Sequence, residues 1–294
     1  MQSATQGQTW LEIALNGAWT RACQPRIPVT VKEIVDEAIQ CVNAGAAIVN
    51  VQARDESTGS PTDHTDSYAR IIDGIRSKVD AIVYPCIAGV QRDGLGSAKQ
   101  RFSLLEELAR LGLIEWMALD PGSTNFALYD DVREDKPGFV FINPEEDIRL
   151  GLKLAMRHGL HPSYAIYEPG FLRLGASLHW RESCPAPIYR LMFSSGYTFS
   201  FPPEDYAVTA YLRLLDQVAP GAPWMLSGLE VDVLPMIPRA IAEGGHVRVG
   251  LQDAPAGCDK SNLQLAEEAV QQIENCGGAL ATAQDVRAVL SPDE

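Results

Sequence analysis

Two short segments of the chain carry polar side chains at the spacing of one strand face. They read NVQAR at 50–54 and RVGLQD at 248–253. Because side chains at i and i+2 share a face of a β-strand, Asn50 is expected to point with Gln52. By the same rule Arg248 shares a face with Gln252. Amide N–H groups can stabilise an oxyanion, and a guanidinium binds a carboxylate through two hydrogen bonds. The segments therefore indicate a site for a small carboxylate, with Asp253 at the rim as general base.

The predicted substrate-binding group has two further members, Arg54 and Cys86. Each is the last residue of a predicted strand. Cys86 is interpreted as a small buried residue that lines the site, and a nucleophilic thiolate is the alternative. A purely structural interpretation also stays open, in which the amides only bond to one another and Arg248 forms a closed ion pair. The carboxylates that can pair with Arg248 in that case are Asp253, Glu168 and Asp55.

Eight short apolar runs, bounded by Gly, Pro or Asp, must position these residues. Most are hydrophobic on both faces, as buried parallel strands are. They cover residues 10–17, 46–54, 81–86, 114–119, 163–168, 188–193, 223–228 and 246–251. A helical pattern follows each run, and this alternation predicts an α/β fold, a single (β/α)8 TIM barrel. An open doubly wound sheet is the alternative, but no GxGxxG follows the first strand.

The helical stretches have recognisable starts. Thr30 and Glu33 form a capping-box pattern, and Asn143 is predicted to cap a helix that has Pro144 at its first position. Further helices are expected near 65–79, 97–112, 171–182, 203–218, 235–244 and 261–276, with an extra C-terminal helix near 282–290. No linker or shift in composition interrupts the pattern, so one domain is expected over 1–294.

The barrel geometry brings the polar segments together. Active sites of such barrels lie at the carboxyl ends of the strands. Strands eight, one, two and three are neighbours around the barrel, so Arg248, Asn50 and Cys86 are expected to converge on one spot.

The composition narrows the class of partner. Lys and Arg total 24 against 38 Asp and Glu, a formal net charge of −14, which disfavours nucleic acid and anionic membranes. No apolar run has the length of a membrane helix, and the N-terminus has no signal-peptide pattern. Six scattered cysteines without a CxxC indicate free thiols in a cytoplasmic protein. The apolar stripe of the last helix (Val286, Val289, Leu290) favours a homo-oligomer.

The residue types give no sign of a metal site. Five histidines are present, but no HxH or HExxH motif occurs and no carboxylate cluster has metal-ligand spacing.

Four segments of the chain resemble the β-keto acid cleavage enzymes, the family of 3-keto-5-aminohexanoate cleavage enzyme. They are IPVTVKEIVDEAIQCVNAGAAIVNVQARD at 27–55, PGSTNF at 121–126, GFL at 170–172 and GGHVRVGLQD at 244–253. The resemblance implies a barrel that converts a β-keto acid and acetyl-CoA into acetoacetate and a new CoA thioester. It also implies a catalytic role for Arg248 and Asp253, which match the family's pattern.

This chain departs from the family at the zinc site. The family binds zinc through two His in an HxH pattern and a Glu in a GLED pattern, and those positions are Asn50, Gln52 and Gln252 here. Neutral amides bind zinc poorly, so the resemblance implies a divergent member without zinc. Trp19 stands near a position that is commonly acidic in the family, and there it is expected to fill space.

Three functions follow from these observations. The first is carbon–carbon cleavage with acyl transfer on a small β-keto acid, with acetyl-CoA as co-substrate and without zinc. In that function the amide N–H groups of Asn50, Gln52 and Gln252 polarise a ketone together, and Arg248 holds the carboxylate. The second is a catalytically inactive homologue that binds a small carboxylate, and the third is a zinc enzyme with other ligands.

Overall fold

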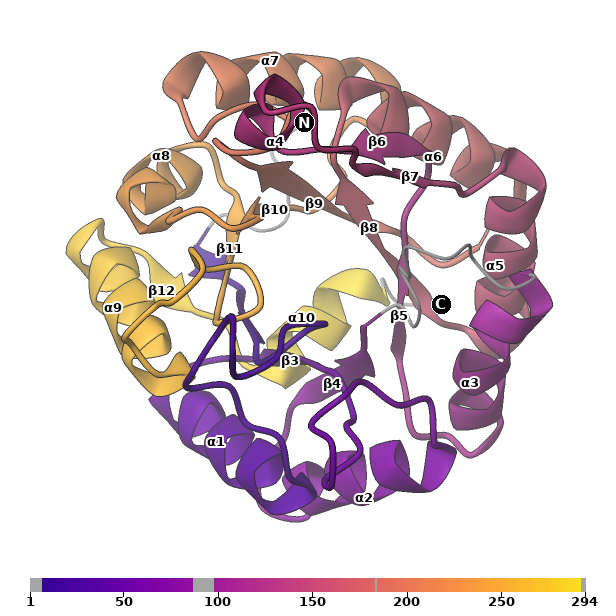
Figure 1. Ribbon diagram of the computed structural model, residues 1–294, viewed down its shortest axis with the longest axis vertical. Coiled ribbons are helices and arrows are strands. Elements are labelled where there is room, and N and C mark those ends of the chain that lie inside the picture. The colour runs from indigo at the N-terminus through magenta and orange to yellow at the C-terminus, as the bar shows by residue number, and fades with distance from the viewer. Residues whose placement is uncertain (1–6, 87–97, 183, 292–294) are drawn as a thin grey trace.

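The computed structural model describes residues 7–86, 98–182 and 184–291. Eight parallel strands form one sheet in the order β4-β3-β2-β11-β10-β9-β8-β5. They are β2 (Leu11–Ala14), β3 (Ile48–Val51), β4 (Ile82–Pro85), β5 (Trp116–Leu119), β8 (His161–Ile166), β9 (Ile188–Phe193), β10 (Trp224–Gly228) and β11 (His246–Val249). β4 and β5, at the two ends of this order, lie side by side and bring the sheet round into a barrel, seen end-on in Figure 1. The predicted (β/α)8 barrel is confirmed, and each predicted run overlaps one strand.

Helices surround the barrel (Figure 1). They are α1 (Val31–Ala44), α2 (Thr65–Arg76), α3 (Ala98–Arg110), α5 (Glu145–His158), α6 (Pro169–Glu182), α7 (Asp205–Val218), α8 (Ile237–Ala242), which follows the short helix η1 (Leu234–Met236), and α9 (Asn262–Asn275). The capping box of Thr30 and Glu33 at α1 is confirmed. The predicted start of α5 is wrong by one residue, because Pro144 precedes the helix as its cap. The Asn143 amide instead donates to the backbone carbonyl of Asp120.

Small elements outside the repeat were not predicted. An antiparallel pair, β6 (Thr124–Phe126) and β7 (Phe139–Phe141), flanks the short helix α4 (Tyr129–Arg133). A second pair joins β1 (Gln8–Thr9) to β12 (Ala279–Leu280). Strands of two or three residues are too short to show a periodicity, which is why the sequence did not reveal them.

The C-terminal helix α10 (Ala283–Leu290) covers the floor of the barrel. Its buried Val286 and Leu290 belong to one apolar cluster with Trp10 and Trp116. Trp10 also stacks on His246, whose pKa burial lowers to about 3, so this histidine is neutral. The apolar stripe of α10 therefore packs mainly on its own barrel and gives no argument for an oligomer. Within the described ranges no helix is long and apolar enough to span a bilayer.

Gly250 allows β11 to pass close to β2. Its φ is +137°, a conformation that residues with a side chain rarely adopt. A Cβ at this position would lie 2.2 Å from the backbone oxygen of Ala14. The two strands can therefore keep this spacing only with glycine here, and the polar residues on both sides of Gly250 depend on it.

The Gly250→Ala substitution is expected to lower the free energy of unfolding by at least about 2 kcal/mol, because it adds backbone strain and a clash with backbone. Gly257→Ala is the control, since its φ is +72° and a Cβ there meets nothing within 4 Å. Urea denaturation of both variants measures the difference. Equal losses of stability would show that the close approach at Gly250 is unimportant.

Candidate active site

Arg248 lies at the centre of the barrel and is paired with two carboxylates. Its Nε donates to Asp253 Oδ2 at 2.7 Å, its Nη2 donates to Asp253 Oδ1 at 3.0 Å, and its Nη1 donates to Glu12 Oε1. The guanidinium and the Glu12 side chain are 0% exposed. Burial opposes the charged form of Arg248, but Asp253 and Glu12 outweigh burial and raise its pKa. All three nitrogens already donate to carboxylates of the protein, so these contacts do not support the expectation that Arg248 holds the carboxylate of a substrate.

Glu12 is the partner that the sequence analysis missed. The closed pair of the structural interpretation forms with Asp253 and Glu12, and not with Glu168 or Asp55. Glu168 accepts from Thr124 Oγ1 at 2.8 Å, and Asp55 accepts from the turn that follows it. A single charged residue within the apolar run WLEIAL was the available signal, since an unpaired carboxylate is almost never fully buried.

Tyr84 and Ser163 extend this cluster across the barrel. The Tyr84 hydroxyl donates to Glu12 Oε1 at 2.6 Å and lies 3.2 Å from Ser163 Oγ. Burial and the adjacent Glu12 carboxylate raise the pKa of Tyr84, so it stays protonated and remains a donor. The second oxygen of Glu12, Oε2, is buried and has no hydrogen-bond partner in the described part of the chain. The cluster therefore keeps one free acceptor in the barrel interior.

The three amides do not converge on one point. Asn50 Nδ2 donates to the Tyr84 carbonyl at 3.2 Å, on the barrel side of β3. Gln52 Nε2 instead donates to Tyr68 Oη of α2 at 2.8 Å. The expectation that Asn50 and Gln52 point together is wrong, because Gln52 lies just past the end of β3 and there the strand alternation stops. An oxyanion site made from all three amides is therefore excluded in this arrangement.

Cys86 contacts the side chains of the other two amides, Asn50 and Gln252. Its Sγ lies 3.0 Å from Asn50 Oδ1 and 3.1 Å from Gln252 Oε1. Burial raises the pKa of Cys86 to about 12, and the nearby Arg248 only partly offsets this. The thiol is therefore protonated at neutral pH, and a thiolate nucleophile is disfavoured. The sulfur and the two amides line one side of the barrel mouth, and Gln252 Nε2 makes no hydrogen bond with the residues described.

Arg54 holds the loop that supports Gln252. Its guanidinium donates to the carbonyls of Asn16 at 3.1 Å, Gly17 at 2.6 Å and Gly59 at 2.8 Å. A Cβ on Gly17 would lie 2.5 Å from the Gln252 side chain, so glycine is needed there. These bonds do not support the predicted contact between Arg54 and substrate.

Trp19 closes the same loop over the end of β11. Its Nε1 donates to the backbone oxygen of Gln252 at 2.7 Å, and the half-buried ring packs against the core. Trp19 thus fills space at this position, as expected from the sequence.

Arg190 and Asp120 were not among the predicted site residues. Arg190, on β9, is 5% exposed, and its Nη2 donates to the Ser163 carbonyl at 3.2 Å. Its Nε has no partner, and no carboxylate of the described residues lies within ion-pair distance. Asp120 follows β5, and burial raises its pKa to about 6 although Arg190 acts in the opposite direction. Their signal was again a charge within or next to a buried strand, IYRLMF and WMALD.

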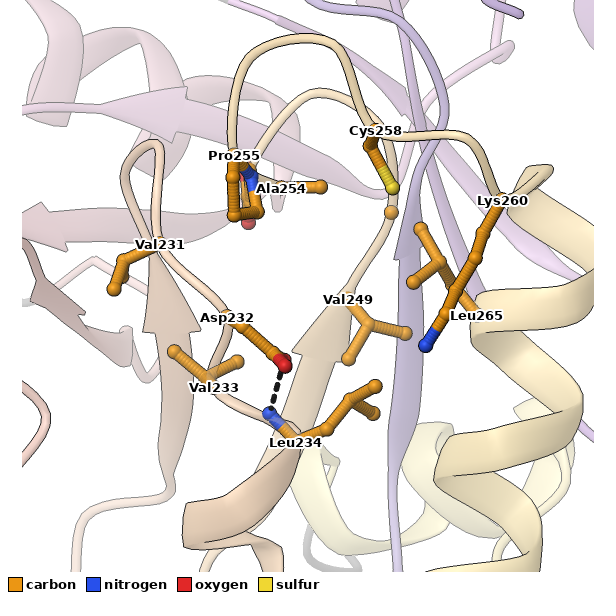
Figure 2. A pocket seen from close by; sticks show the side chains of 12 residues that line it. Val231, Asp232, Val233, Leu234, Val249, Ala254, Pro255, Cys258, Lys260 and Leu265 are labelled. Carbon is orange, nitrogen blue, oxygen red and sulfur yellow. Dashed lines mark hydrogen bonds between the residues drawn. The ribbon is translucent and has the colours of Figure 1, made fainter.

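A surface pocket lies between the segment after β10 and the segment that joins β11 to α9 (Figure 2). Val233, Val249 and Leu265 give it apolar walls, and Lys260 stands at its side. Asp253 is also among the residues that line it. Asp253 therefore belongs both to the Arg248 cluster and to the lining of this pocket.

The donor set does not fit zinc. The three family positions hold neutral amides, and Gln52 turns toward α2. Among the residues that the structure describes, no group of three or more His, Cys, Asp or Glu side chains is arranged to hold a metal ion.

The barrel and its buried Arg–carboxylate cluster define a class, the (β/α)8 enzymes that act at the carboxyl ends of the strands. The profile of the β-keto acid cleavage enzyme family matches residues 8–291, so the chain belongs to that family of lyases and acyltransferases.

Relatives of established function support this assignment. The chain is 28% identical to 3-keto-5-aminohexanoate cleavage enzyme of Fusobacterium nucleatum over 278 residues, covering 92% of this chain and 93% of that protein. It is 26% identical to 3-dehydrocarnitine:acetyl-CoA trimethylamine transferase of Rhizobium meliloti, covering 95% of each. It is 25% identical to 3-oxoadipate:acetyl-CoA acetyltransferase of Cupriavidus necator, covering 95% of this chain and 93% of that protein. Names of these relatives include both cleavage enzymes and acetyl-CoA transferases.

Solved structures show the same fold. The binary complex of ObcA with oxaloacetate superposes with a TM-score of 0.71 at 16% identity, covering 91% of this chain and 67% of ObcA. Type I 3-dehydroquinate dehydratase of Clostridium difficile gives a TM-score of 0.56 at 11% identity and covers 92% and 93% of the two chains.

Proposed function

We propose that this chain exchanges acyl groups between a small β-keto acid and acetyl-CoA in a site that uses no zinc. The observation that carries the proposal is the buried Arg248–Asp253 pair, in a chain whose three family metal positions hold neutral amides. Family relatives that use acetyl-CoA support the co-substrate. The overall exchange turns R–CO–CH2–COO⁻ and acetyl-CoA into R–CO–S–CoA and acetoacetate, and neither an oxidant nor a reductant is needed.

Asp253 is the general base of this proposal. Burial raises its pKa above the ordinary value for an aspartate even though Arg248 acts in the opposite direction, so the carboxylate is a stronger base than usual. Both oxygens accept from Arg248, and each retains a lone pair for a proton. Arg248 is then a positioning residue that fixes Asp253 beside the pocket.

The reaction begins when Asp253 takes a proton from the carbon between the ketone and the carboxylate. The carbanion attacks the acetyl carbonyl, a carbon–carbon bond forms, and the CoA thiolate leaves. The thiolate then attacks the original ketone carbon, the bond to the former C2 breaks, and acetoacetate leaves with its proton restored. Gln252 Nε2, which makes no hydrogen bond within the described part of the chain, is the donor that would stabilise the enolate oxygen.

The purified protein is expected to carry no stoichiometric zinc and to keep its activity after chelation. The assay combines acetyl-CoA with a panel of β-keto acids and measures acetoacetate and the new CoA thioester by mass spectrometry. The Asp253→Asn variant is the control, and its rate is expected to fall by about 10²-fold or more because it lacks the base.

Two results would contradict this proposal. One is about one zinc per chain together with loss of activity on chelation, which means that unrecognised ligands hold a metal. The other is no exchange with any acid of the panel although small carboxylates bind, which is the behaviour of an inactive homologue.

A further inference from the structure

Arg190 is a buried guanidinium with a single hydrogen-bond partner among the residues that the structure describes. A guanidinium carries five N–H donors, and among the described residues Arg190 makes one hydrogen bond with them, from Nη2 to the Ser163 carbonyl at 3.2 Å. Its Nε is buried without any partner in the described part of the chain. Burying a charge in this way is costly unless something pairs with it. The small number of hydrogen bonds that Arg190 makes with the described residues therefore points to a bound anion as its partner.

A chain of contacts links the Arg190 guanidinium to the Arg248 cluster. Ser163, whose carbonyl it contacts, has its hydroxyl 3.2 Å from Tyr84 Oη, and Tyr84 donates to Glu12. The charge of Arg190 also acts on the pKa of Asp253 and of Cys86, in each case lowering it against the effect of burial. An anion on Arg190 is consequently close to the proposed base.

The two arginines of the barrel differ in what they still can bind. Arg248 already donates to two carboxylates through all three of its nitrogens, whereas Arg190 forms no ion pair with any carboxylate in the described ranges. A β-keto acid brings a carboxylate into a site whose metal positions hold neutral amides, so a cation must come from elsewhere. We propose that Arg190 is the cation that binds the carboxylate of the β-keto acid; the identity of that acid class rests on the proposed function.

The test is a comparison of two ligands that differ in one charge. Calorimetry measures the binding of acetoacetate and of its uncharged methyl ester to the wild type, Arg190→Gln and Arg190→Lys. The control is Arg76→Gln, which removes an arginine paired with Glu115 away from the site. The wild type is expected to prefer acetoacetate over the ester by about 30-fold or more, as expected for a buried charge pair.

Arg190→Gln is expected to weaken acetoacetate binding by about 30-fold or more and to leave the ester within about 3-fold. Arg190→Lys keeps the charge and is expected to retain part of the preference, while Arg76→Gln keeps all of it. Unchanged acetoacetate affinity in a folded Arg190→Gln protein overturns the inference, as does a wild type without preference for the carboxylate. Arg190-dependent binding without exchange activity upholds the inference and refutes the proposed function.

Discussion

The Arg248→Met substitution is expected to lower the free energy of unfolding by about 3–5 kcal/mol, the scale for removing one partner of a buried ion pair. Methionine fills much of the space, so the loss is chiefly electrostatic. Glu12 and Asp253 would remain buried without their cation, and both meet Arg248 through direct hydrogen bonds. Urea denaturation at pH 7 measures the effect.

The loss is expected to depend on pH, with a definite sign. Arg248 lowers the folded-state pKa of Asp253, so without it burial raises that pKa further above the unfolded value. A carboxyl group with a raised pKa binds more protons in the folded state, so stability falls as pH increases through the window between the two values. Arg248→Met should therefore be closest to the wild type in acid and furthest from it at neutral pH.

Arg190→Met is the matched control for this prediction. It also replaces a buried arginine on a barrel strand, but one that donates a single hydrogen bond and has no ion-pair partner in the described chain. Its stability is expected to change much less than that of Arg248→Met. If the two variants lose similar stability, the ion pairs of Arg248 do not account for the loss in Arg248→Met.

The fold could be predicted from the sequence because each strand and helix carries its own local signal. Short apolar runs and helical patterns alternate eight times, and caps such as Thr30 mark where helices begin. Each of these signals lies within about ten residues. The antiparallel pair of β6 and β7 depends on contacts between short strands separated by α4, and no local period indicates it.

The candidate site could be predicted only in part. Strand parity placed Arg248 inside the barrel correctly, but it failed for Gln52, which lies beyond the last residue of β3. The pairing of Arg248 with Glu12 joins residues 236 positions apart, and one sequence does not show which charges meet across a barrel. For the same reason the lack of an ion pair at Arg190 is visible only in three dimensions.

Asp120 is expected to lower the stability of the protein above pH 6. Its side chain is buried, and burial raises its pKa from 3.8 to about 6. The charged groups that face it are Arg190, Arg248 and Arg101, and all three favour the carboxylate but do not offset burial. Asp120→Asn removes the buried charge and is therefore expected to stabilise the protein by about 2–3 kcal/mol at pH 8, since one pKa unit corresponds to about 1.4 kcal/mol.

The sign of this effect follows from proton binding. Between pH 3.8 and about 6 the folded state holds a proton on Asp120 that the unfolded state has lost, so the wild type loses stability as pH increases across this window. Above about pH 6 the cost is complete, and below 3.8 it is absent. The advantage of Asp120→Asn should accordingly appear between these values and be small at pH 4. Urea denaturation of both proteins at pH 4, 6 and 8 measures it.

The ionisation of Asp120 can also be measured independently, through the binding of a carboxylate to Arg190. Ionised Asp120 acts on Arg190 and repels an incoming carboxylate, so wild-type affinity for acetoacetate is expected to increase as pH falls through about 6. Asp120→Asn has no charge to lose, and its affinity should be nearly constant over this range. Two results would contradict this account of Asp120. One is an Asp120→Asn protein that is less stable than the wild type at pH 8. The other is an Asp120→Asn protein whose binding keeps the same pH dependence, which means that another group near Arg190 titrates.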